Sequence, residues 1–382
     1  MCTSLRAQFL ANALRCRSLK RSVYAELHEI RVLVTQLYTS SVISCILAPL
    51  DPLPMTPLVS IIIPVYKAEQ TLPACLAQLR AQTYRHLQII FVDDCSPDGG
   101  LAYLETQKPL LEELGMEVDL LHHEVNQGVA SSRNTGISAV RGEYIYSVDA
   151  DDMLDPRAIQ LFVDRAQQTG ADIIGCEYLL SQGDSLRRIS QPEVKTGIEA
   201  LHQIFAGKMK WNLWLFMIRR SLLDTAGPSP FLPGVNMGED LMLLGKLLHR
   251  ASSVSIIHEP LYTYVRSDQQ ITSVYRPEHW QQVETNVREL ESYLKEHASA
   301  RELELLHHLK LNLKLPLLIS TQREDFDRWS TMYPESNAYI LKNSSLPFRT
   351  KLLQYMAAKK QFWFVILYNK VIMRWLYKIL YR

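Results

Sequence analysis

Three aspartates follow a short hydrophobic run near the middle of the chain. Residues 144–148, Tyr-Ile-Tyr-Ser-Val, are aromatic and β-branched, which is typical of a buried strand. Asp149, Asp151 and Asp152 come directly after this run. Carboxylates this close repel one another unless a cation lies between them, and Mg²⁺ or Mn²⁺ binds oxygen ligands of this kind, commonly together with substrate phosphates. The spacing therefore favours a divalent-cation site for a phosphorylated substrate.

Two other interpretations fit the same residues. The first is an acidic surface turn before a helix, with Asp155 as the N-cap and Pro156 in the first turn. The second is the Asp-Asp-x-x-Asp pattern of prenyl-diphosphate enzymes, which Asp151, Asp152 and Asp155 match. That pattern belongs on a helix of an all-helical fold, whereas here a strand leads into it. The strands and helices that precede these aspartates in the chain are needed to choose among the three interpretations.

Strands and helices alternate over residues 58–180. Nearly continuous apolar runs at 58–66 and 87–92 are typical of parallel strands buried on both faces, and helical spacing separates them. We therefore predict an α/β fold with a doubly wound, mostly parallel sheet. In such sheets ligands bind outside the carboxyl ends of the strands. Polar or aromatic residues follow three of the predicted strands there: Tyr66 and Glu69, Asp93 and Asp94, and Asp149 and Asp151.

The pattern changes downstream. Residues 171–179 predict another strand, and 255–265 predict two short strands around His258-Glu259-Pro260. Glu239 and Asp240 precede a predicted helix, where acidic residues also complement the helix dipole. Trp211 and Trp214 are suited equally to stacking on sugar rings and to core packing. From residue 277 onwards the pattern is helical.

Composition excludes several classes of protein. The chain has 382 residues and a net charge of +1, so its charge gives no reason to expect nucleic acid as a partner. Its six cysteines form no C-x-x-C pair, which favours reduced cytoplasmic thiols over disulfides or a zinc site. The histidine pairs 122–123 and 307–308 lack ligand partners at metal spacing and are interpreted as structural. No apolar run approaches the ~18 residues that span a bilayer.

The C-terminal stretch from Phe362 is rich in aromatic and aliphatic residues. One basic stripe runs along the predicted helix, formed by Lys370, Arg374, Lys378 and Arg382. We expect this helix to lie on an anionic membrane surface, with the basic stripe at the headgroups. The alternative is that it docks on the helices of residues 277–320.

Five motifs, taken together and in order, resemble those of family 2 glycosyltransferases. They are the stretches 59–66 and 90–98, Asn126-Gln127-Gly128 with Ser132-Arg133-Asn134, residues 142–156, and Gly238-Glu239-Asp240. The likeness covers roughly residues 58–275 and is closest to bacterial members, which have a GT-A fold and build surface polysaccharides. It implies a GT-A domain over 58–275 and a helical C-terminal region over 276–382. Residues 1–57 are then an N-terminal extension and Pro-rich linker, and Met55 is the expected natural start.

The resemblance assigns the donor site residue by residue. The loop that holds the base and ribose is expected to contain Pro64, Val65, Tyr66 and Glu69. Asp94 looks like the carboxylate that hydrogen-bonds the base, with Asp93 beside it, and Arg133 is expected near the diphosphate. Two departures are mild: Cys95 stands where Gly is commoner, and Lys67 where Asn is commoner.

The resemblance also assigns the reaction centre. Asp149-Ala150-Asp151 matches the Asp-x-Asp motif, in which Ala150 contacts the donor and Asp149 and, above all, Asp151 bind Mn²⁺ or Mg²⁺. Asp240, with Glu239 beside it, matches the catalytic base. A metal at Asp151 would stabilise charge on the departing diphosphate, and a carboxylate would take the proton of the attacking hydroxyl.

The expected function is therefore an inverting glycosyltransferase. It would move a sugar from a nucleoside diphosphate sugar, UDP-sugar being expected, to a hydroxyl of a glycan or lipid-linked acceptor. The product would be bacterial capsule, lipopolysaccharide or exopolysaccharide, and the enzyme would lie on the inner face of the cytoplasmic membrane. The alternative from another class is a nucleotide-sugar-binding partner subunit without catalysis.

Overall fold

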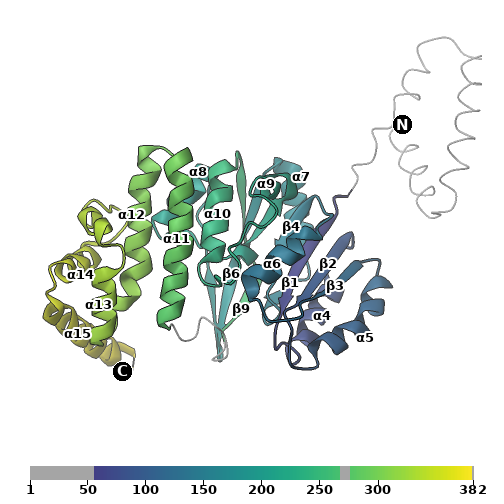
Figure 1. The fold of residues 1–382 in the computed structure, drawn as a ribbon, viewed down its shortest axis with the longest axis horizontal. Helices are drawn as coiled ribbons and strands as arrows, with labels where there is room; N and C mark the ends of the chain where they lie inside the picture. The colour runs from purple at the N-terminus through teal and green to yellow at the C-terminus, as the bar shows by residue number, and fades with distance from the viewer. Residues whose placement is uncertain (1–55, 267–275, 381–382) are drawn as a thin grey trace, which may run out of the picture. The chain divides into compact units, whose positions relative to one another are not determined.

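The computed structural model describes residues 56–266 and 276–380, with side chains as far as residue 371. Residues Pro57–Arg382 form one compact unit. Figure 1 shows a twisted sheet at one end of this unit and a stack of helices at the other. The predicted N-terminal extension up to residue 55 and the predicted start at Met55 lie outside the described residues.

The first half of the sheet is parallel. Its strands lie in the order β3-β2-β1-β4, where β1 is Val59–Val65, β2 is Leu87–Asp93, β3 is Glu117–His122 and β4 is Tyr144–Ser147. The connecting helices are α4 (Leu72–Ala81), α5 (Gly100–Glu112) and α6 (Val129–Ser138). Every residue of β2 is buried, and so is all of β1 except Pro64, as continuous apolar runs predict. The carboxyl ends of β1, β2 and β4 therefore meet at one edge.

The second half of the sheet is mixed. It continues β4-β8-β6-β9-β5, and β7 pairs with β6. The bounds are β5 Met153–Leu154, β6 Ile173–Gln182, β7 Ser185–Ile189, β8 Phe216–Arg219 and β9 Val254–Val265. β8 is antiparallel to both β4 and β6, while β6 and β9 are parallel. The α/β class is confirmed, and the sheet is more mixed than expected because the four-residue β8 enters from a segment with no strand periodicity.

Two local predictions are wrong. Residues 255–265 form one strand, β9, because a bulge opposite Glu177 absorbs Pro260, which has no N–H for the ladder. Asp155 does not cap the next helix, α7 (Ala158–Thr169). Its Oδ1 instead accepts the N–H of Arg157 at 2.8 Å, a local turn that delays the helix start.

The C-terminal helical region is confirmed. Its helices are α11 (Pro277–His297), α12 (Ala300–Lys314), α13 (Arg323–Thr331), α14 (Phe348–Ala358) and α15 (Phe362–Leu380). α11 packs directly against α10 (Glu239–Arg250), and the two stand side by side with α12 in Figure 1. Gly245 permits this approach, since a Cβ there would lie 2.8 Å from a methyl carbon of Leu290. None of the helices in the described residues has the length and apolarity needed to span a membrane.

Candidate active site

Arg133 gathers three carboxylates at the carboxyl edge of the sheet. Its Nη1 lies 2.8 Å from Glu239 Oε1 and 2.8 Å from Asp240 Oδ1, and its Nη2 lies 3.4 Å from Asp149 Oδ1. Arg133 is only 4% exposed, and Glu239 and Asp240 are each 8% exposed. We call these four residues the ion cluster. It unites three of the sequence motifs, although more than 100 residues separate Arg133 from Glu239 and Asp240 in sequence.

The ion cluster holds more negative than positive charge. Burial, with the neighbouring Asp240 carboxylate, raises the pKa of Glu239 to about 8 although Arg133 opposes the shift. Burial also raises the pKa of Asp149, and Arg133 again opposes it while Asp151 and Asp240 add to it. A single guanidinium therefore does not compensate the carboxylates, which is the electrostatic setting in which catalytic acids and bases are found.

Contacts between α6 and residues 231–240 assemble the cluster. The Asn134 side chain exchanges two hydrogen bonds with the backbone of Phe231, at 2.9 and 3.0 Å. Asn236 Oδ1 accepts the N–H of Ala130 in the first turn of α6 at 3.0 Å. Gly238, with φ of +79°, then turns the chain so that α10 begins at Glu239. Both acidic residues thus sit at a helix N-terminus, where the dipole favours negative charge.

Asp94 is held within the protein. Its Oδ1 accepts the N–H of Gln127 at 2.8 Å and contacts His123 Nδ1 at 2.7 Å, and its Oδ2 accepts the N–H of Gly128 at 2.7 Å. Gly128 has φ of +86°, and a Cβ there would lie 2.2 Å from Asn236 Nδ2. Asp94 therefore shapes the loop that leads into α6, and His123 supports it as a structural histidine.

Asp93, at the end of β2, points its carboxylate into a tighter space. Its Oδ2 lies 2.8 Å from His122 Nδ1 and accepts the N–H of Ser96 at 3.2 Å. Its buried Oδ1 has no hydrogen-bond partner among the described residues. A buried acceptor without a partner is costly, and Asp93 is only 1% exposed, so this oxygen is an unpaired polar atom inside the fold at the end of β2.

The loop after β1 lies beside the loop after β2. Pro64 and Val65 end β1, and Tyr66 is 47% exposed. The Glu69 N–H donates to Asp98 Oδ2 at 3.0 Å, and the Gly99 N–H donates to Glu69 Oε2 at 3.0 Å. The exposed Tyr66 ring is thus the part of this loop that a planar ligand can reach.

The two sequence departures share one backbone conformation. Lys67 has φ of +54° and Cys95 has φ of +55°. This left-handed region favours glycine and asparagine, which are the commoner residues at these positions in the resembling family. Both residues therefore carry some backbone strain in this conformation.

The Asp-x-Asp segment follows β4. Asp151 is exposed, the side chain of Asp149 is 31% exposed, and Ala150 between them is buried. Asp152 points inward, where its Oδ2 accepts from the Tyr262 hydroxyl at 2.8 Å and its Oδ1 from the Val265 N–H at 2.8 Å. Burial and the Asp149 and Asp151 charges raise the pKa of Asp152 to about 9. Asp152 is therefore engaged in hydrogen bonds within the fold, whereas Asp149 and Asp151 are the more exposed carboxylates of the segment.

A metal would need further ligands from its substrate. In residues 56–266 and 276–371 no three His, Cys, Asp or Glu side chains are arranged so that they could hold a metal ion by themselves. Two neighbouring carboxylates with repelling charges fit a hard divalent cation that completes its shell with diphosphate oxygens and water.

Trp214 belongs to the core. It is 3% exposed and stacks on Tyr262 at 4.3 Å between ring centroids, with Tyr178 edge-on at 5.0 Å. The Tyr262 hydroxyl also donates to Asp152 and accepts the Asp149 N–H at 3.2 Å. Trp214 therefore supports the Asp-x-Asp segment through Tyr262 and does not offer its face to a sugar. Trp211 remains half-buried.

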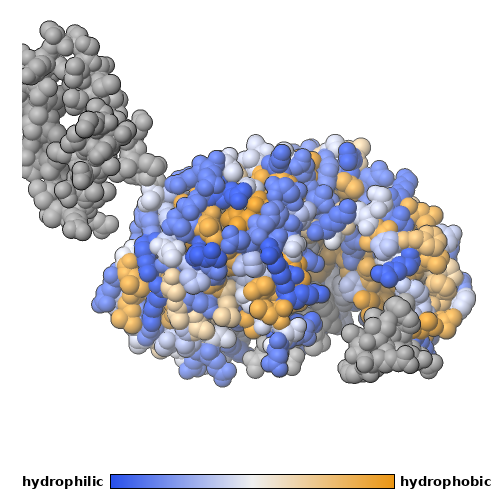
Figure 2. All heavy atoms as spheres, turned by 180° about the vertical axis from the view of Figure 1, so that it is seen from behind, coloured by the Kyte–Doolittle hydropathy of each residue, from blue (hydrophilic) through white to orange (hydrophobic). Residues whose placement is uncertain are grey.

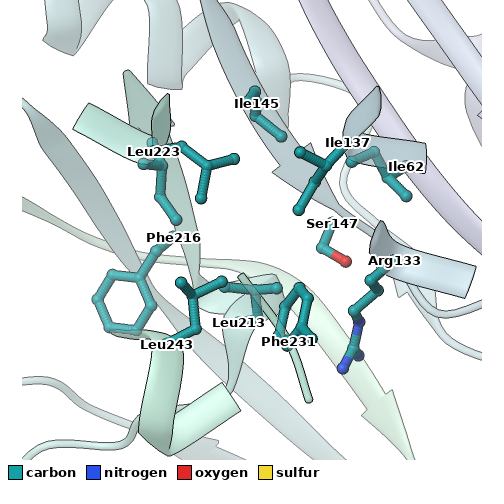
Figure 3. A pocket seen from close by; sticks show the side chains of 11 residues that line it. Ile62, Arg133, Ile137, Ile145, Ser147, Leu213, Phe216, Leu223, Phe231 and Leu243 are labelled. Carbon is teal, nitrogen blue, oxygen red and sulfur yellow. The ribbon is translucent and has the colours of Figure 1, made fainter. Parts of the chain in front are cut away.

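Behind the ion cluster lies an apolar cavity. Figure 3 shows Arg133 and Ser147 at one end of it and Ile145, Phe216, Leu223 and Leu243 around the rest. Arg133 Nε and Ser147 Oγ are buried and have no hydrogen-bond partner among the described residues. Low polarity on this side limits water access and strengthens the electrostatic interactions of the cluster.

Sequence reasoning missed the residues that hold the site together. Asn134, Asn236 and Tyr262 act through side chains that reach across the fold, and only Asn134 lies in a motif that the sequence singled out. The predicted residues do not all converge either. Arg133, Asp149, Glu239 and Asp240 meet in the ion cluster, whereas the Asp93–Asp94 pair and the Tyr66–Glu69 loop form a neighbouring group at the ends of β1 and β2.

The class of protein follows from comparison with known sequences. The family model "Glycosyl transferase family 2" matches residues 60–225. The chain is 33% identical over 224 residues to the glycosyltransferase GlyG of Streptococcus pneumoniae, covering 56% of this chain and 72% of GlyG. The chain belongs to glycosyltransferase family 2, which confirms the resemblance.

Particular relatives share the fold and part of the length. The chain is 30% identical to the uncharacterized glycosyltransferase EpsJ of Bacillus subtilis, covering 58% of this chain and 65% of EpsJ. It thus spans less than two thirds of that relative. Among solved structures, Staphylococcus aureus TarS in complex with UDP-GlcNAc matches with a TM-score of 0.63 at 17% identity, covering 83% of this chain and 91% of that one. The likeness to TarS establishes the shared fold.

Proposed function

We propose that the protein is an inverting glycosyltransferase that transfers a sugar from a UDP-sugar to a hydroxyl of a glycan or lipid-linked acceptor in bacterial surface polysaccharide synthesis. The ion cluster carries this proposal, since it brings Asp149 of the Asp-x-Asp segment within reach of the Glu239-Asp240 pair through one arginine. The bound UDP-GlcNAc of the fold neighbour TarS supports a UDP-sugar as donor.

Asp240 is the proposed base. Its Oδ2 accepts the Leu213 N–H at 2.9 Å and its Oδ1 faces Arg133, so the carboxylate is fixed in orientation at the start of α10. A fixed carboxylate can take the proton of an acceptor hydroxyl as that oxygen attacks the anomeric carbon. A single attack opposite the leaving diphosphate inverts the anomeric centre. Glu239 contacts the same Arg133 guanidinium as Asp240. Its raised pKa means that it binds a proton more readily than an ordinary glutamate, which reduces the negative charge beside Asp240.

Asp149 and Asp151 are the proposed ligands of Mn²⁺ or Mg²⁺. A bound cation of this kind would neutralise charge on the diphosphate leaving group. Asp151 lies at the exposed end and faces solvent, and Asp149 lies against Arg133. In our proposal Asp94, with Asp93 beside it, and the Tyr66 loop hold the base and ribose, because the Asp94 N–H donates to Val65 O at 2.9 Å and the pair therefore lies beside the loop that exposes Tyr66.

The experiment that tests the donor site is a calorimetric titration with UDP. We expect binding in the presence of Mn²⁺ and a loss of at least tenfold in affinity in EDTA, and the Asp151→Asn variant should show the weaker affinity in both buffers. Equal affinity with metal and with EDTA would contradict the metal role. Binding without release of UDP from any UDP-sugar in the presence of acceptor extracts would favour the partner-subunit alternative.

We also propose that the enzyme works at the cytoplasmic membrane surface through α15. One face of α15 is docked: Phe362 stacks on Phe326 at 4.8 Å, and Asn369 Nδ2 donates to Leu318 O at 2.6 Å. The other face exposes Trp363, Leu367 and Val371, which are 61%, 52% and 57% exposed. Helix α15 therefore packs on the helical region with one face and exposes an apolar stripe on the other.

Charge favours a membrane over a protein as the partner of this stripe. Lys359, Lys360 and Lys370 are exposed beside it, and no acidic residue follows Glu335 in sequence. Figure 2 shows hydrophobic side chains gathered at the end of the unit that carries these helices. The side chains of Arg374, Lys378 and Arg382, which the predicted basic stripe includes, lie outside the described residues.

Flotation with liposomes tests this location. The chain should float with vesicles containing anionic phosphatidylglycerol at low salt and detach as salt is raised, because each cation near the surface contributes about 1 kcal/mol. The Trp363→Ser/Leu367→Ser variant should float less, while a matched Leu186→Ser variant on a distant exposed leucine should not change. Equal flotation of all three proteins, or of none, would remove the membrane from the proposal.

A further inference from the structure

Residues Asp149–Asp152 form a tight turn that a single tyrosine hydroxyl holds at both ends. The N–H of Asp152 donates to Asp149 O at 3.2 Å, which closes the turn. The Tyr262 hydroxyl accepts the N–H of Asp149 at 3.2 Å and donates to Asp152 Oδ2 at 2.8 Å. The hydroxyl therefore uses its oxygen at the first residue of the turn and its proton at the last. We call residues Asp149–Asp152 the aspartate turn.

Strand β9 anchors the aspartate turn from the inside of the fold. Asp152 is 3% exposed, and its Oδ1 accepts the N–H of Val265 at 2.8 Å. The chain directly after the turn is paired with β9 as well, because Leu154 of β5 lies opposite Tyr262. The turn is thus fastened through its buried carboxylate, while the two proposed metal ligands remain its more exposed carboxylates.

The ring that carries the hydroxyl is itself held by packing. Tyr262 is 1% exposed, and its ring stacks on that of Trp214 with 4.3 Å between centroids and 12° between planes. Trp214 is in turn held by its backbone, since its carbonyl oxygen accepts the Tyr146 hydroxyl at 2.7 Å. A ring packed in this way leaves its hydroxyl little freedom to move, so the hydroxyl is a preorganised partner for the aspartate turn.

The segment that packs on Tyr262 also contacts the proposed base. Trp214 lies in the short 3₁₀ helix Leu213–Leu215, and the N–H of Leu213 donates to Asp240 Oδ2 at 2.9 Å. Two neighbouring residues therefore contact the base directly and the aspartate turn through the Tyr262 ring. The placement of the turn relative to the base is thus transmitted by Tyr262.

We infer that Tyr262 is a positioning residue for the metal ion: its hydroxyl holds the aspartate turn in the conformation in which Asp149 and Asp151 bind Mn²⁺ or Mg²⁺ together with the diphosphate. The inference rests on the proposed function, since it requires that a cation binds there. A cation with few protein ligands depends on how those ligands are oriented, and removing a group that orients metal ligands typically weakens metal binding by ~10–100-fold. Tyr262 acts only through the turn, by way of Asp149 and Asp152.

The test compares Tyr262→Phe with Tyr84→Phe. Each change removes one buried hydroxyl and keeps the aromatic ring, so both variants are expected to fold. Tyr84 is the matched control because it is 5% exposed and its hydroxyl donates to Pro57 O, just before the amino end of β1. Mn²⁺ is titrated into each protein with UDP present, and free Mn²⁺ is followed by electron paramagnetic resonance, with a titration of UDP alone as the blank. Calorimetry of UDP in EDTA measures the metal-independent part of donor binding.

The expected result is a defect confined to metal binding. Tyr262→Phe should need at least tenfold more Mn²⁺ than the unmodified chain for half-maximal binding, because the turn loses the hydroxyl that joins its two ends. Its UDP affinity in EDTA should be unchanged, and Tyr84→Phe should match the unmodified chain in both measurements. Melting temperatures of both variants separate a loss of stability from a loss of metal binding.

The outcomes distinguish this inference from the proposed function. An equal Mn²⁺ requirement in Tyr262→Phe and the unmodified chain would overturn the inference, even with a lowered melting temperature, and would leave the glycosyltransferase proposal standing. An equal rise in both variants would also overturn it, since a general loss of packing would then explain the effect. If the unmodified chain binds UDP equally with Mn²⁺ and with EDTA, the proposed metal role fails and the inference fails with it.

Discussion

Two buried cations in this protein have opposite surroundings. Arg133, in the α/β region, contacts three carboxylates, those of Asp149, Glu239 and Asp240. Lys314, at the end of α12, is fully buried, and no carboxylate lies within ion-pair distance of it in the described chain. Its Nζ donates to Met332 O at 2.9 Å, to Asn337 Oδ1 at 2.8 Å and to Tyr333 O at 3.3 Å, and it lies 4.1 Å from the Trp329 ring centroid.

The difference distinguishes the candidate active site from a structural site. Around Arg133 burial and the surplus of negative charge raise the pKa of Glu239, a perturbation of the kind that is commoner at functional sites than in the structural core. Around Lys314 neutral oxygens and an aromatic ring satisfy the ammonium without surplus charge, and they join α12 to the segment after α13. The buried cation with unbalanced partners thus belongs to the candidate active site, and the one with neutral partners stabilises the packing of the helical region.

The largest effect is expected at Asp240. Asp240→Asn keeps the size of the side chain but removes the basic oxygen, and its single amide oxygen can accept from Leu213 or from Arg133 but not from both. We expect turnover to fall by a factor on the order of 10² to 10⁴ while UDP affinity stays almost unchanged. Steady-state kinetics with a nucleotide-sugar panel and UDP calorimetry measure the two quantities. Near-normal turnover of the variant would show that Asp240 is not the base and only forms an ion pair with Arg133.

The next effect is the loss of the cation from the ion cluster. Arg133→Met leaves three carboxylates without their shared partner, so we expect the free energy of unfolding to drop by about 3–5 kcal/mol and activity to be lost. Denaturant unfolding followed by circular dichroism measures the stability. A drop below about 1 kcal/mol in the free energy of unfolding would mean that the three carboxylates bind protons or other partners once Arg133 is removed.

Lys314→Met is the matched change in the helical region. It leaves the carbonyls of Met332 and Tyr333 without a donor, so we expect a loss of about 1–3 kcal/mol in stability with kcat of the folded enzyme unchanged. A fall in kcat with normal folding would show that the helical region is coupled to the reaction centre. Arg133→Met and Lys314→Met together test the comparison, because only the first should abolish activity while both should lower stability.

The Lys314 contribution should also depend on pH. Burial lowers the pKa of Lys314 to about 8, below the ordinary 10.5 of the unfolded chain. Between these values the unfolded chain binds the proton and the folded chain does not, so stability rises with pH across that window. The difference in melting temperature between the unmodified chain and Lys314→Met should therefore grow from pH 7 to pH 9.5. A constant difference would contradict the lowered pKa.

The smallest effect is expected at His258, on the surface of β9. Hydrogen bonds to the carboxylates of Glu193 at 2.7 Å and Glu177 at 3.1 Å raise the pKa of His258. The stabilisation is fully present below the unfolded pKa of about 6.5 and is lost as pH rises through the raised folded pKa. Because the side chain is 47% exposed, His258→Gln should change stability at pH 6 by only a few tenths of a kcal/mol, and less at pH 8. Thermal melts at the two pH values measure it, and an effect that grows with pH would reverse the assigned sign.

The sequence by itself determined the strands of the parallel half of the sheet and the residue types at their carboxyl ends. The apolar runs of β1 and β2 predicted buried parallel strands because such strands hide both faces, and the acidic residues after β2 and β4 had to share one edge once the strands were parallel. The family followed from ordered motifs and is confirmed. The roles of the individual site residues stay predictions until the substitutions are measured.

Only the tertiary structure decided which of these residues meet. Local sequence gives no sign that Arg133 pairs with Glu239 and Asp240, or that Asp152 turns inward to Tyr262 while Asp151 stays exposed. Those outcomes depend on side chains that reach across more than 100 positions and on a short antiparallel strand, β8, that carries no periodic signal. Hydrophobic periodicity records what each segment buries, whereas the pairing of charges depends on where separate segments come to rest against one another, and that is a property of the packed chain.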